Sequence, residues 1–296
     1  FSHDVNAGIG HIDTRGKLIK FNRITLSDPV IGLITDTTGE MNLVWYINKL
    51  SPGNDTIKKE KSEVRIKELE VINGRFTLIN KSVKKSKIPI DFSNLHLQKV
   101  NCLAEDIVNL NDTTTLQIGK LEFTESGGLR VKKMTGRLLI TKTDINLTST
   151  SVICDSSILN IDQVKMKAES PESFKNFEKE VILNIILDKS LVSSTELKYF
   201  IPALEKINMT VNISGKVTGT VSELRGRNIE LTYGDHTALE CDFDFSGLPE
   251  IENSFMFLGI NNLKTNANDL EKIIIPGKSL MVLPDILYKL GTIKAN

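Results

Sequence analysis

The chain has 296 residues and a hydrophobic content of 40%, which suits one large β domain or two ordinary domains of a soluble protein. Its 37 basic residues (Lys and Arg) balance its 37 acidic residues (Asp and Glu), and no basic block exceeds a few residues. This balance excludes nucleic acid or an anionic membrane surface as an electrostatic partner.

The first part of the chain predicts short strands and a loop. Strands are expected around Leu18–Leu26 and Val30–Leu33, and Met41–Leu50 fits either a strand or a short helix. Pro52-Gly53-Asn54-Asp55 is a turn sequence, and the charged run Lys58–Glu63 that follows it is a solvated connector. The pattern fits both a cap on the following sheet and the first segment of that sheet.

A bend is expected at Asn73-Gly74. Apolar residues have odd numbers before it (Leu69, Val71) and even numbers after it (Phe76, Leu78). A tight turn or a β-bulge explains this change of phase.

Between Val64 and Phe257, apolar and polar residues alternate with a period of two, as in a sheet with one apolar face. Turn-forming separators at Asn111-Asp112, 125–128 and Thr148–Ser151 favour a meander of strands. The expected strands are Leu95–Ala104, Leu116–Phe123, Leu129–Met134, Arg137–Leu147, Ile158–Ala168, Val181–Leu187, Met209–Val221, Ile229–Tyr233, Leu239–Phe245 and Phe255–Leu263. Val181–Leu187 is apolar in both phases, which indicates a strand covered on both faces.

One amphipathic helix is expected at Ser194–Ile207, with Ser194 as its N-cap and a kink at Pro202. A single helical turn is expected at Ser170–Phe174. The sequence 202–207 resembles 284–290, which predicts a repeated helix-then-sheet unit.

These patterns divide the chain into six regions. They are an N-terminal β region that caps or begins the sheet (1–53), a charged connector (54–62), a first β-groove segment (63–168), a linker with a strand and a short helix (169–207), a second β-groove segment (208–275) and the truncated start of a next repeat unit (276–296).

The sequence contains no catalytic or metal-binding signature. The motifs GxSxG, HExxH and the P-loop are absent, and the four histidines are scattered. Cys102, Cys154 and Cys241 are far apart and are expected to be small core residues. Asp242 and Asp244 alternate with apolar residues, which is typical of a solvated sheet face. We therefore expect no enzyme, no cofactor and no metal.

No run reaches the roughly 20 apolar residues of a membrane-spanning helix. The chain begins at Phe1 without a signal peptide, so we expect a piece of a longer protein whose anchor lies outside it.

The apolar stripe itself allows two structures. It fits the closed core of a β-sandwich or barrel, and it equally fits a sheet that curls without closing and leaves an open apolar trough.

The order of several motifs resembles the TamB-like branch of the AsmA family. Ile24–Val30 and then Ile66–Leu78 resemble the opening repeats of AsmA-like proteins. Phe200–Leu204, Val211–Leu224 and Ser246–Pro249 are similar to the N-terminal half of the Bacteroidota type. The similarity spans nearly the whole chain.

This resemblance implies a mainly β fold: an elongated, curled β-sheet with an open hydrophobic groove (a β-taco) and one or two short amphipathic helices. It also implies a periplasmic protein, anchored in the inner membrane through a missing segment, that conducts phospholipids toward the outer membrane and supports outer-membrane biogenesis. A BamA- or TamA-like barrel is the implied partner of regions outside this chain.

The hypothesis drawn from the sequence is a non-enzymatic lipid conduit whose groove is lined by the apolar-phase residues. These are Leu69, Val71, Phe76, Leu78, Leu95, Leu97, Leu121, Phe123, Ile145, Leu147, Met209, Val211, Ile213, Ile229, Leu231, Cys241, Phe243 and Phe245. The alternative is a scaffold for protein translocation and assembly that binds the barrel partner and handles no lipid. A carbohydrate-active β domain that uses a carboxylate pair is a third hypothesis.

Overall fold

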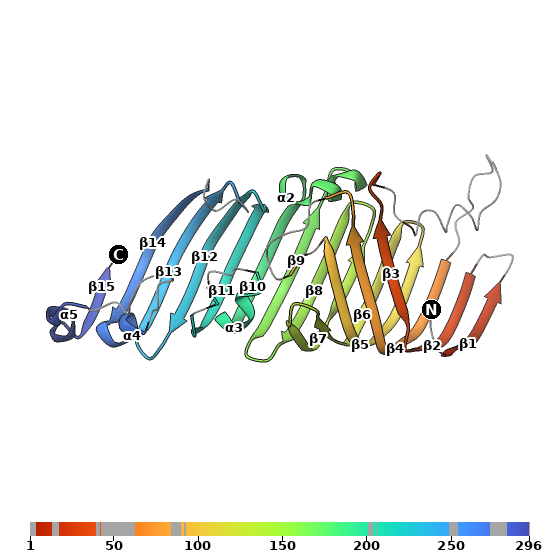
Figure 1. The fold of residues 1–296 in the computed structure, drawn as a ribbon, viewed down its shortest axis with the longest axis horizontal. Coiled ribbons are helices and arrows are strands. Elements are labelled where there is room, and N and C mark those ends of the chain that lie inside the picture. Colours follow the sequence, from red (N-terminus) through yellow and green to blue (C-terminus); the bar gives the residue numbers. More distant parts are fainter. Residues whose placement is uncertain are drawn as a thin grey trace. The chain divides into compact units, whose positions relative to one another are not determined.

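The structure, a computed structural model, describes residues 4–13, 18–39, 42, 63–83, 90–91, 93–200, 204–205, 207–248, 254–272 and 283–295. It divides into two units, residues 1–135 and 136–296. Both units consist mainly of β-strands with a few short helices, which confirms the predicted fold class (Figure 1).

The first unit is built on long strands that pair in both directions. Its strands are β1 (Asp4–Asp13), β2 (Leu18–Ser27), β3 (Val30–Thr35), β4 (Glu63–Asn80), β5 (Asn94–Leu110) and β6 (Thr113–Glu125), and the boundary between the units falls inside β7 (Arg130–Ile140). The pairs β1–β2, β4–β5 and β5–β6 are antiparallel, but β2 and β3 both pair with β4 in parallel. The predicted meander therefore begins only at β4. Of the expected loop and connector before it, the segments 43–50 and 51–62 lie outside the described residues.

β2 and β3 are two parts of one edge, interrupted at Asp28-Pro29. β2 pairs with β4 up to Ile72 and β3 resumes the pairing at Arg75. Pro29 has no amide hydrogen to donate, and its carbonyl instead accepts a hydrogen bond from the Arg75 amide at 2.7 Å. Opposite the break, Asn73 has a positive φ of 53°, and the β4–β5 register shifts on both sides of Gly74. The bend expected at Asn73-Gly74 is therefore a bulge.

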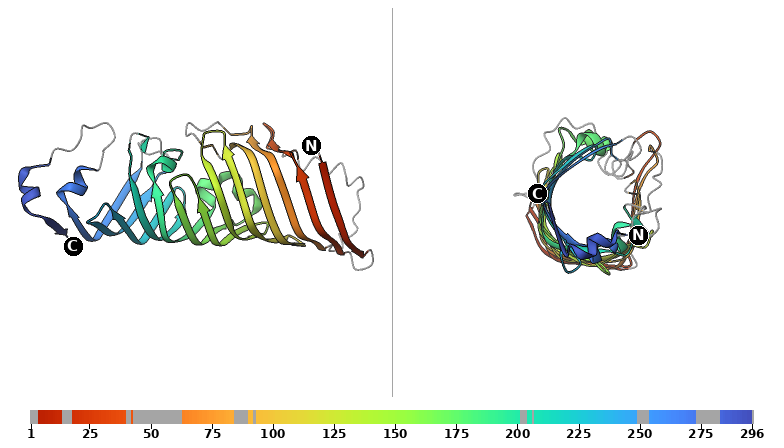
Figure 2. Two further views of the ribbon diagram at one scale, coloured as in Figure 1. Left: turned by 90° about the horizontal axis from the view of Figure 1, so that it is seen from below. Right: turned by 90° about the vertical axis from the view of Figure 1, so that its left-hand side faces the viewer.

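The second unit is a succession of antiparallel strands. The strands are β8 (Asp144–Ile153), β9 (Ile158–Lys167), β10 (Ile182–Ser193), β11 (Thr210–Thr220), β12 (Glu223–Tyr233), β13 (Thr237–Ser246), β14 (Phe255–Asn266) and β15 (Thr292–Ala295). Each pairs with the next in antiparallel fashion. Among the described residues no pairing joins β15 back to β8, so this sheet is open, and its strands follow a curve (Figure 2).

Five short helices accompany these strands. They are η1 (Pro171–Asn176), α2 (Phe177–Glu180), α3 (Ser194–Leu197), α4 (Ala267–Glu271) and α5 (Asp285–Lys289). Within the described residues, none of the helices is long and apolar enough to cross a membrane.

Two predicted strand boundaries are wrong. Arg137–Leu147 is not one strand, because the Thr141 hydroxyl accepts hydrogen bonds from the amides of Thr143 and Asp144 and closes a turn there. The expected separator at 148–151 lies inside β8, where Ser149 takes a positive φ of 49° but the pairing with β9 keeps the same register on both sides of it.

The helix predicted at Ser194–Ile207 is also wrong in length. The α-helix ends at Leu197, and its N-cap is Ser193, whose side chain accepts from the Thr195 amide. Tight turns follow, in which the Tyr199 and Phe200 amides bond to carbonyls three residues back. Residues 201–203, including the predicted kink, lie outside the described residues.

The main buried cluster of the second unit lies at the start of β10. Val181 and Leu183 are buried with Ala168, and Phe174 of η1 and Phe177 of α2 pack against them. Ile182, on the other face, is 54% exposed. The prediction that this strand is covered on both faces is therefore wrong, because the short helices cover one face only.

Candidate functional site

In the first unit, cross-strand pairing brings the predicted apolar residues to one side of the sheet. Val71 of β4 lies opposite Cys102 of β5, which lies opposite Leu121 of β6. Directly paired residues of neighbouring strands share a face. The first apolar face consists of Leu69, Val71, Phe76, Leu78, Leu95, Leu97, Leu121 and Phe123.

The bulge at Asn73-Gly74 is what keeps this face continuous. Without an extra residue, the change from odd to even apolar positions would move Phe76 to the opposite face from Val71. The bulge absorbs one residue on β4, and a second bulge at Lys99, with φ of 52°, restores the register on β5. Phe76 then lies opposite Leu97, on the same side as Val71.

In the second unit, the apolar residues form rows that run across the strands. One row crosses seven strands in the order Leu147, Val164, Ile185, Val217, Gly226, Phe243 and Leu258. A second row runs Ile145, Met166, Leu183, Gly219, Leu224, Phe245 and Met256. The second apolar face comprises these rows together with Met209, Val211, Ile213, Ile229, Leu231 and Cys241.

All eighteen predicted residues thus lie on one of these two faces. Three of them, Val211, Ile229 and Cys241, are buried, and the other fifteen are partly exposed. A closed core would bury side chains of this type almost completely. Apart from the region around Leu183, where Phe174 and Phe177 of the short helices pack, the two faces are therefore shielded by their neighbours but not covered.

The prediction missed several members of the second apolar face. Val164, Met166, Ile185 and Val217 lie in its rows but were not singled out. Their strands show the same alternation, so the sequence contained a signal for them. The sequence does not show the cross-strand register, which determines the residues of neighbouring strands that lie in the same row.

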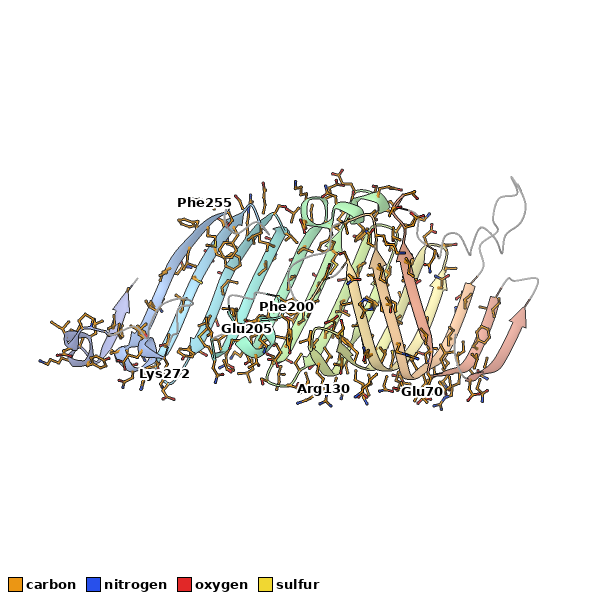
Figure 3. The ribbon with its side chains drawn as sticks, viewed as in Figure 1. Glu70, Arg130, Phe200, Glu205, Phe255 and Lys272 are labelled. Atoms are coloured by element: carbon orange, nitrogen blue, oxygen red, sulfur yellow. The ribbon has the colours of Figure 1, made fainter. Side chains whose placement is uncertain are left out.

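The opposite side of each sheet is polar. In the first unit Arg23 pairs with Glu68 at 3.0 Å and with Glu70 at 2.7 Å, and these side chains are solvent-accessible. Figure 3 shows Glu70 at the lower margin of the first unit. In the second unit Arg227 pairs with Asp244 at 2.7 Å, and Asp242 accepts from the Asn228 amide. Asp242 and Asp244, both partly exposed, therefore have structural partners.

Two short helices of the second unit each carry a buried carboxylate that accepts hydrogen bonds from a hairpin turn. Glu196 of α3 accepts hydrogen bonds from the Ser156 amide at 2.9 Å and the Ser157 hydroxyl at 2.6 Å, in the β8–β9 turn. Asp269 of α4 accepts from the His236 amide at 2.9 Å and the Thr237 hydroxyl at 3.0 Å, in the β12–β13 turn.

The position of α4 identifies the concave side of the second unit. Thr237 and Thr265, whose hydroxyls are 2.8 Å apart, lie in the same strand phase as Leu239 and Leu263, on the apolar face. The Thr237 hydroxyl bonds to Asp269 of α4, and α4 lies on the inner side of the curve (Figure 2). The second apolar face is therefore the concave one.

The thiols of these faces are not activated. Burial raises the pKa of Cys102, and burial together with the charge of Asp242 raises the pKa of Cys241. A raised pKa keeps a thiol protonated and poorly nucleophilic at neutral pH. Cys154 and Cys241 are buried, as predicted, whereas Cys102 is only partly buried.

A small polar pocket of about 250 Å³ lies beside the bulges of the first unit. It is lined by Asp28, Asn73, Arg75, Gln98 and Lys99. Asn73 donates to Asp28 through its side chain and to Asn101 through its backbone amide, so the polar groups at its floor hold the bulge together.

The described residues contain no group of three or more His, Cys, Asp or Glu side chains placed to hold a metal ion. The two partly exposed apolar faces are the candidate site. No family model, no curated protein and no solved structure matches the chain, so its membership of the TamB-like AsmA family stays a prediction from the sequence.

Proposed function

We propose that the chain is a non-enzymatic segment of a lipid conduit, in which the two apolar faces hold the acyl chains of phospholipids. By its sequence resemblance, the conduit is a periplasmic TamB-like protein anchored in the inner membrane, and it supports outer-membrane biogenesis. The observation that carries the proposal is the partial exposure of fifteen of the eighteen apolar residues on curved, open sheets.

The chemistry of the faces suits an acyl chain better than a polar ligand. Their rows consist of Leu, Ile, Val, Met and Phe side chains, interrupted mainly by glycine. Transfer of methylene groups from water to such a surface contributes about 0.8 kcal/mol per CH₂. An acyl tail with roughly ten buried methylenes gains enough to offset the loss of freedom on binding. A zwitterionic or anionic headgroup would remain in solvent at the open side.

Charge placed on the two phases of one sheet tests this proposal. We expect Val211→Asp and Phe243→Asp to abolish binding of a phospholipid that carries a fluorescent acyl chain, because each puts an unpaired carboxylate on the concave face. Asn212→Asp is the matched control, since Asn212 is exposed on the polar face. Binding is measured by fluorescence titration, with circular dichroism to establish that each variant is folded.

Equal loss of binding in Phe243→Asp and Asn212→Asp, with both proteins folded, would contradict the proposal. Retained binding in Phe243→Asp would contradict it as well. Either result would favour the scaffold function, in which the sheet binds a protein partner and no lipid.

A further inference from the structure

The polar pocket of the first unit is separate from the two apolar faces. Arg75, which lines the pocket, is in the opposite strand phase from Phe76 of the first apolar face, so the pocket lies on the polar side of the sheet. Its volume of about 250 Å³ is slightly below the roughly 300–1,000 Å³ of pockets that take drug-sized ligands. The pocket therefore suits a small ligand, and acyl binding on the apolar faces does not account for it.

Two cationic side chains line this pocket without a protein partner. Within the described residues, neither the Arg75 guanidinium nor the Lys99 ammonium forms an ion pair or a side-chain hydrogen bond. Arg65, on the same strand but outside the pocket, is by contrast paired with Glu63. The amide of Gln98, which also lines the pocket, has no partner in the described part of the chain. Three donor side chains are therefore available to one ligand.

These donors suit a phosphate group better than a carboxylate. A guanidinium donates two parallel hydrogen bonds to either group, which uses both oxygens of a carboxylate. A phosphate has further oxygens, and these leave acceptors for the Lys99 ammonium and the Gln98 amide. The two positive charges also match the charge of a phosphate.

The pocket carries one negative charge as well. One carboxylate oxygen of Asp28 accepts a hydrogen bond from the Asn73 side chain, and the other has no partner among the described residues. This carboxylate repels a phosphate that carries no other charge. A ligand with an ammonium group near its phosphate matches the charges of Asp28, Arg75 and Lys99 together.

The backbone holds the pocket in a fixed shape. Asp28, Asn73 and Lys99 are three of the seven non-glycine residues with positive φ in the described part of the chain. The Asn73 amide donates to the Asn101 side chain at 2.8 Å, which fixes the bulge between the two strands. Uncommon backbone conformations of this kind cluster at ligand-binding sites. A preformed pocket also loses less freedom when it binds.

We propose that this pocket binds a small zwitterion that carries a phosphate and a primary ammonium group, such as phosphoethanolamine. The phosphate lies against Arg75, Gln98 and Lys99, and the ammonium group against Asp28. Two sources share this chemistry, a soluble phosphate ester and the headgroup of a phospholipid. The site does not depend on the proposed function, because it shares no residue with the apolar faces.

Isothermal titration calorimetry of the whole chain with phosphoethanolamine tests the proposal. We expect a Kd of about 0.1–1 mM, and binding at least about tenfold weaker in Arg75→Gln, which loses the paired charged hydrogen bonds. Arg65→Gln is the matched control, because Arg65 is an exposed arginine of the same strand outside the pocket. It should leave the affinity unchanged.

Asp28→Asn tests the role of the negative charge. The variant keeps an oxygen that can accept from Asn73 but loses the carboxylate charge. We expect it to bind phosphoethanolamine at least about threefold more weakly and inorganic phosphate at least about threefold more tightly. Glycerophosphoethanolamine, whose phosphate is a diester as in a phospholipid, identifies the source. Equal affinity for it indicates a lipid headgroup, and a preference for phosphoethanolamine indicates a soluble ester.

No binding of phosphoethanolamine at about 10 mM would overturn the proposal. Unchanged affinity in Arg75→Gln would overturn it too, and so would an equal loss of both probes in Asp28→Asn, with circular dichroism showing that each variant is folded. Phe243→Asp should bind phosphoethanolamine normally, so this site and the acyl-binding faces are tested separately.

Discussion

Single residues decide how closely the strands of the second unit approach. Gly226 has no side chain, and the ring of Phe243 on the neighbouring strand occupies the space where a Cβ would stand. That ring also stacks on Phe245, with 4.5 Å between the ring centroids. Gly215 is similar, since a Cβ there would meet the Asn228 carbonyl at 2.9 Å. Glycine in these strands permits close packing on the concave face.

We expect Gly226→Ala to lower the free energy of unfolding of the second unit by about 1–3 kcal/mol, because the added methyl group forces the Phe243 ring out of its position. Gly259→Ala is the control in the same sheet. Its Cβ would meet Phe257 at 3.4 Å, an ordinary van der Waals contact. Urea unfolding followed by circular dichroism measures both variants. Equal stability of the two would show that Gly226 does not set the packing of Phe243.

At this scale the sequence predicted which face of the sheet a side chain occupies. A period of two assigns each side chain to one of two faces, and all eighteen chosen residues lie on the expected ones. It could not predict which residues become neighbours, such as Gly226 and Phe243, because the cross-strand register shifts at a bulge at Asn228. Asn228 takes a positive φ of 51°, and no simple sequence motif marks this bulge.

At the scale of elements, the second unit contains the same structural arrangement twice. A strand ends in a short helix whose buried carboxylate reaches the turn of the preceding hairpin: Glu196 reaches the β8–β9 turn and Asp269 the β12–β13 turn. Each helix also begins with a capping side chain, Ser193 or Asn266, that accepts from a backbone amide in the first turn. These hydrogen bonds link each helix to the sheet.

The pKa of Asp269 makes the stabilising contribution of this carboxylate depend on pH. Burial acts to raise it, but hydrogen bonds from His236, Thr237 and Asp235 and the charge of Lys272 outweigh burial and lower it. A carboxylate with a lowered pKa in the folded state stabilises that state above its ordinary pKa of about 4, and the contribution fades as the pH falls through the lowered value.

We therefore expect Asp269→Asn to lower the free energy of unfolding by about 1–3 kcal/mol at pH 7, since buried donors lose their charged acceptor. The difference from the unmodified protein should shrink below about pH 4. Urea unfolding from pH 3 to pH 7 measures it, with Glu240→Gln, at an exposed position of β13, as the control. A difference that is constant across this range would contradict the role of the Asp269 charge.

The helices were the poorest part of the sequence prediction. The α3 helix has four residues and α4 has five, too few for a period of 3.6 to show. The apolar spacing around Ser194–Ile207 suggested one long helix. In the structure the helix ends at Leu197, directly after Glu196, which accepts a hydrogen bond from the adjacent turn. A tertiary hydrogen bond, invisible in the local sequence, sets the end of the element.

At the scale of the molecule, both units expose an apolar face to solvent on an open sheet, and the chain has no net charge. The sequence left a closed core and an open trough as equal alternatives. The strand order distinguishes them, because within the described residues the sheet of each unit runs from strand to strand without returning to its first member. The proposal that the chain binds lipid rests on these open apolar faces.

The central claim is that these faces hold phospholipid, and native mass spectrometry tests it most directly. The chain is purified without detergent, and a second portion is extracted with organic solvent to identify any lipid by its mass. We expect phospholipid bound in stoichiometric amount to the folded protein. A stable, folded protein that carries no lipid would contradict the account.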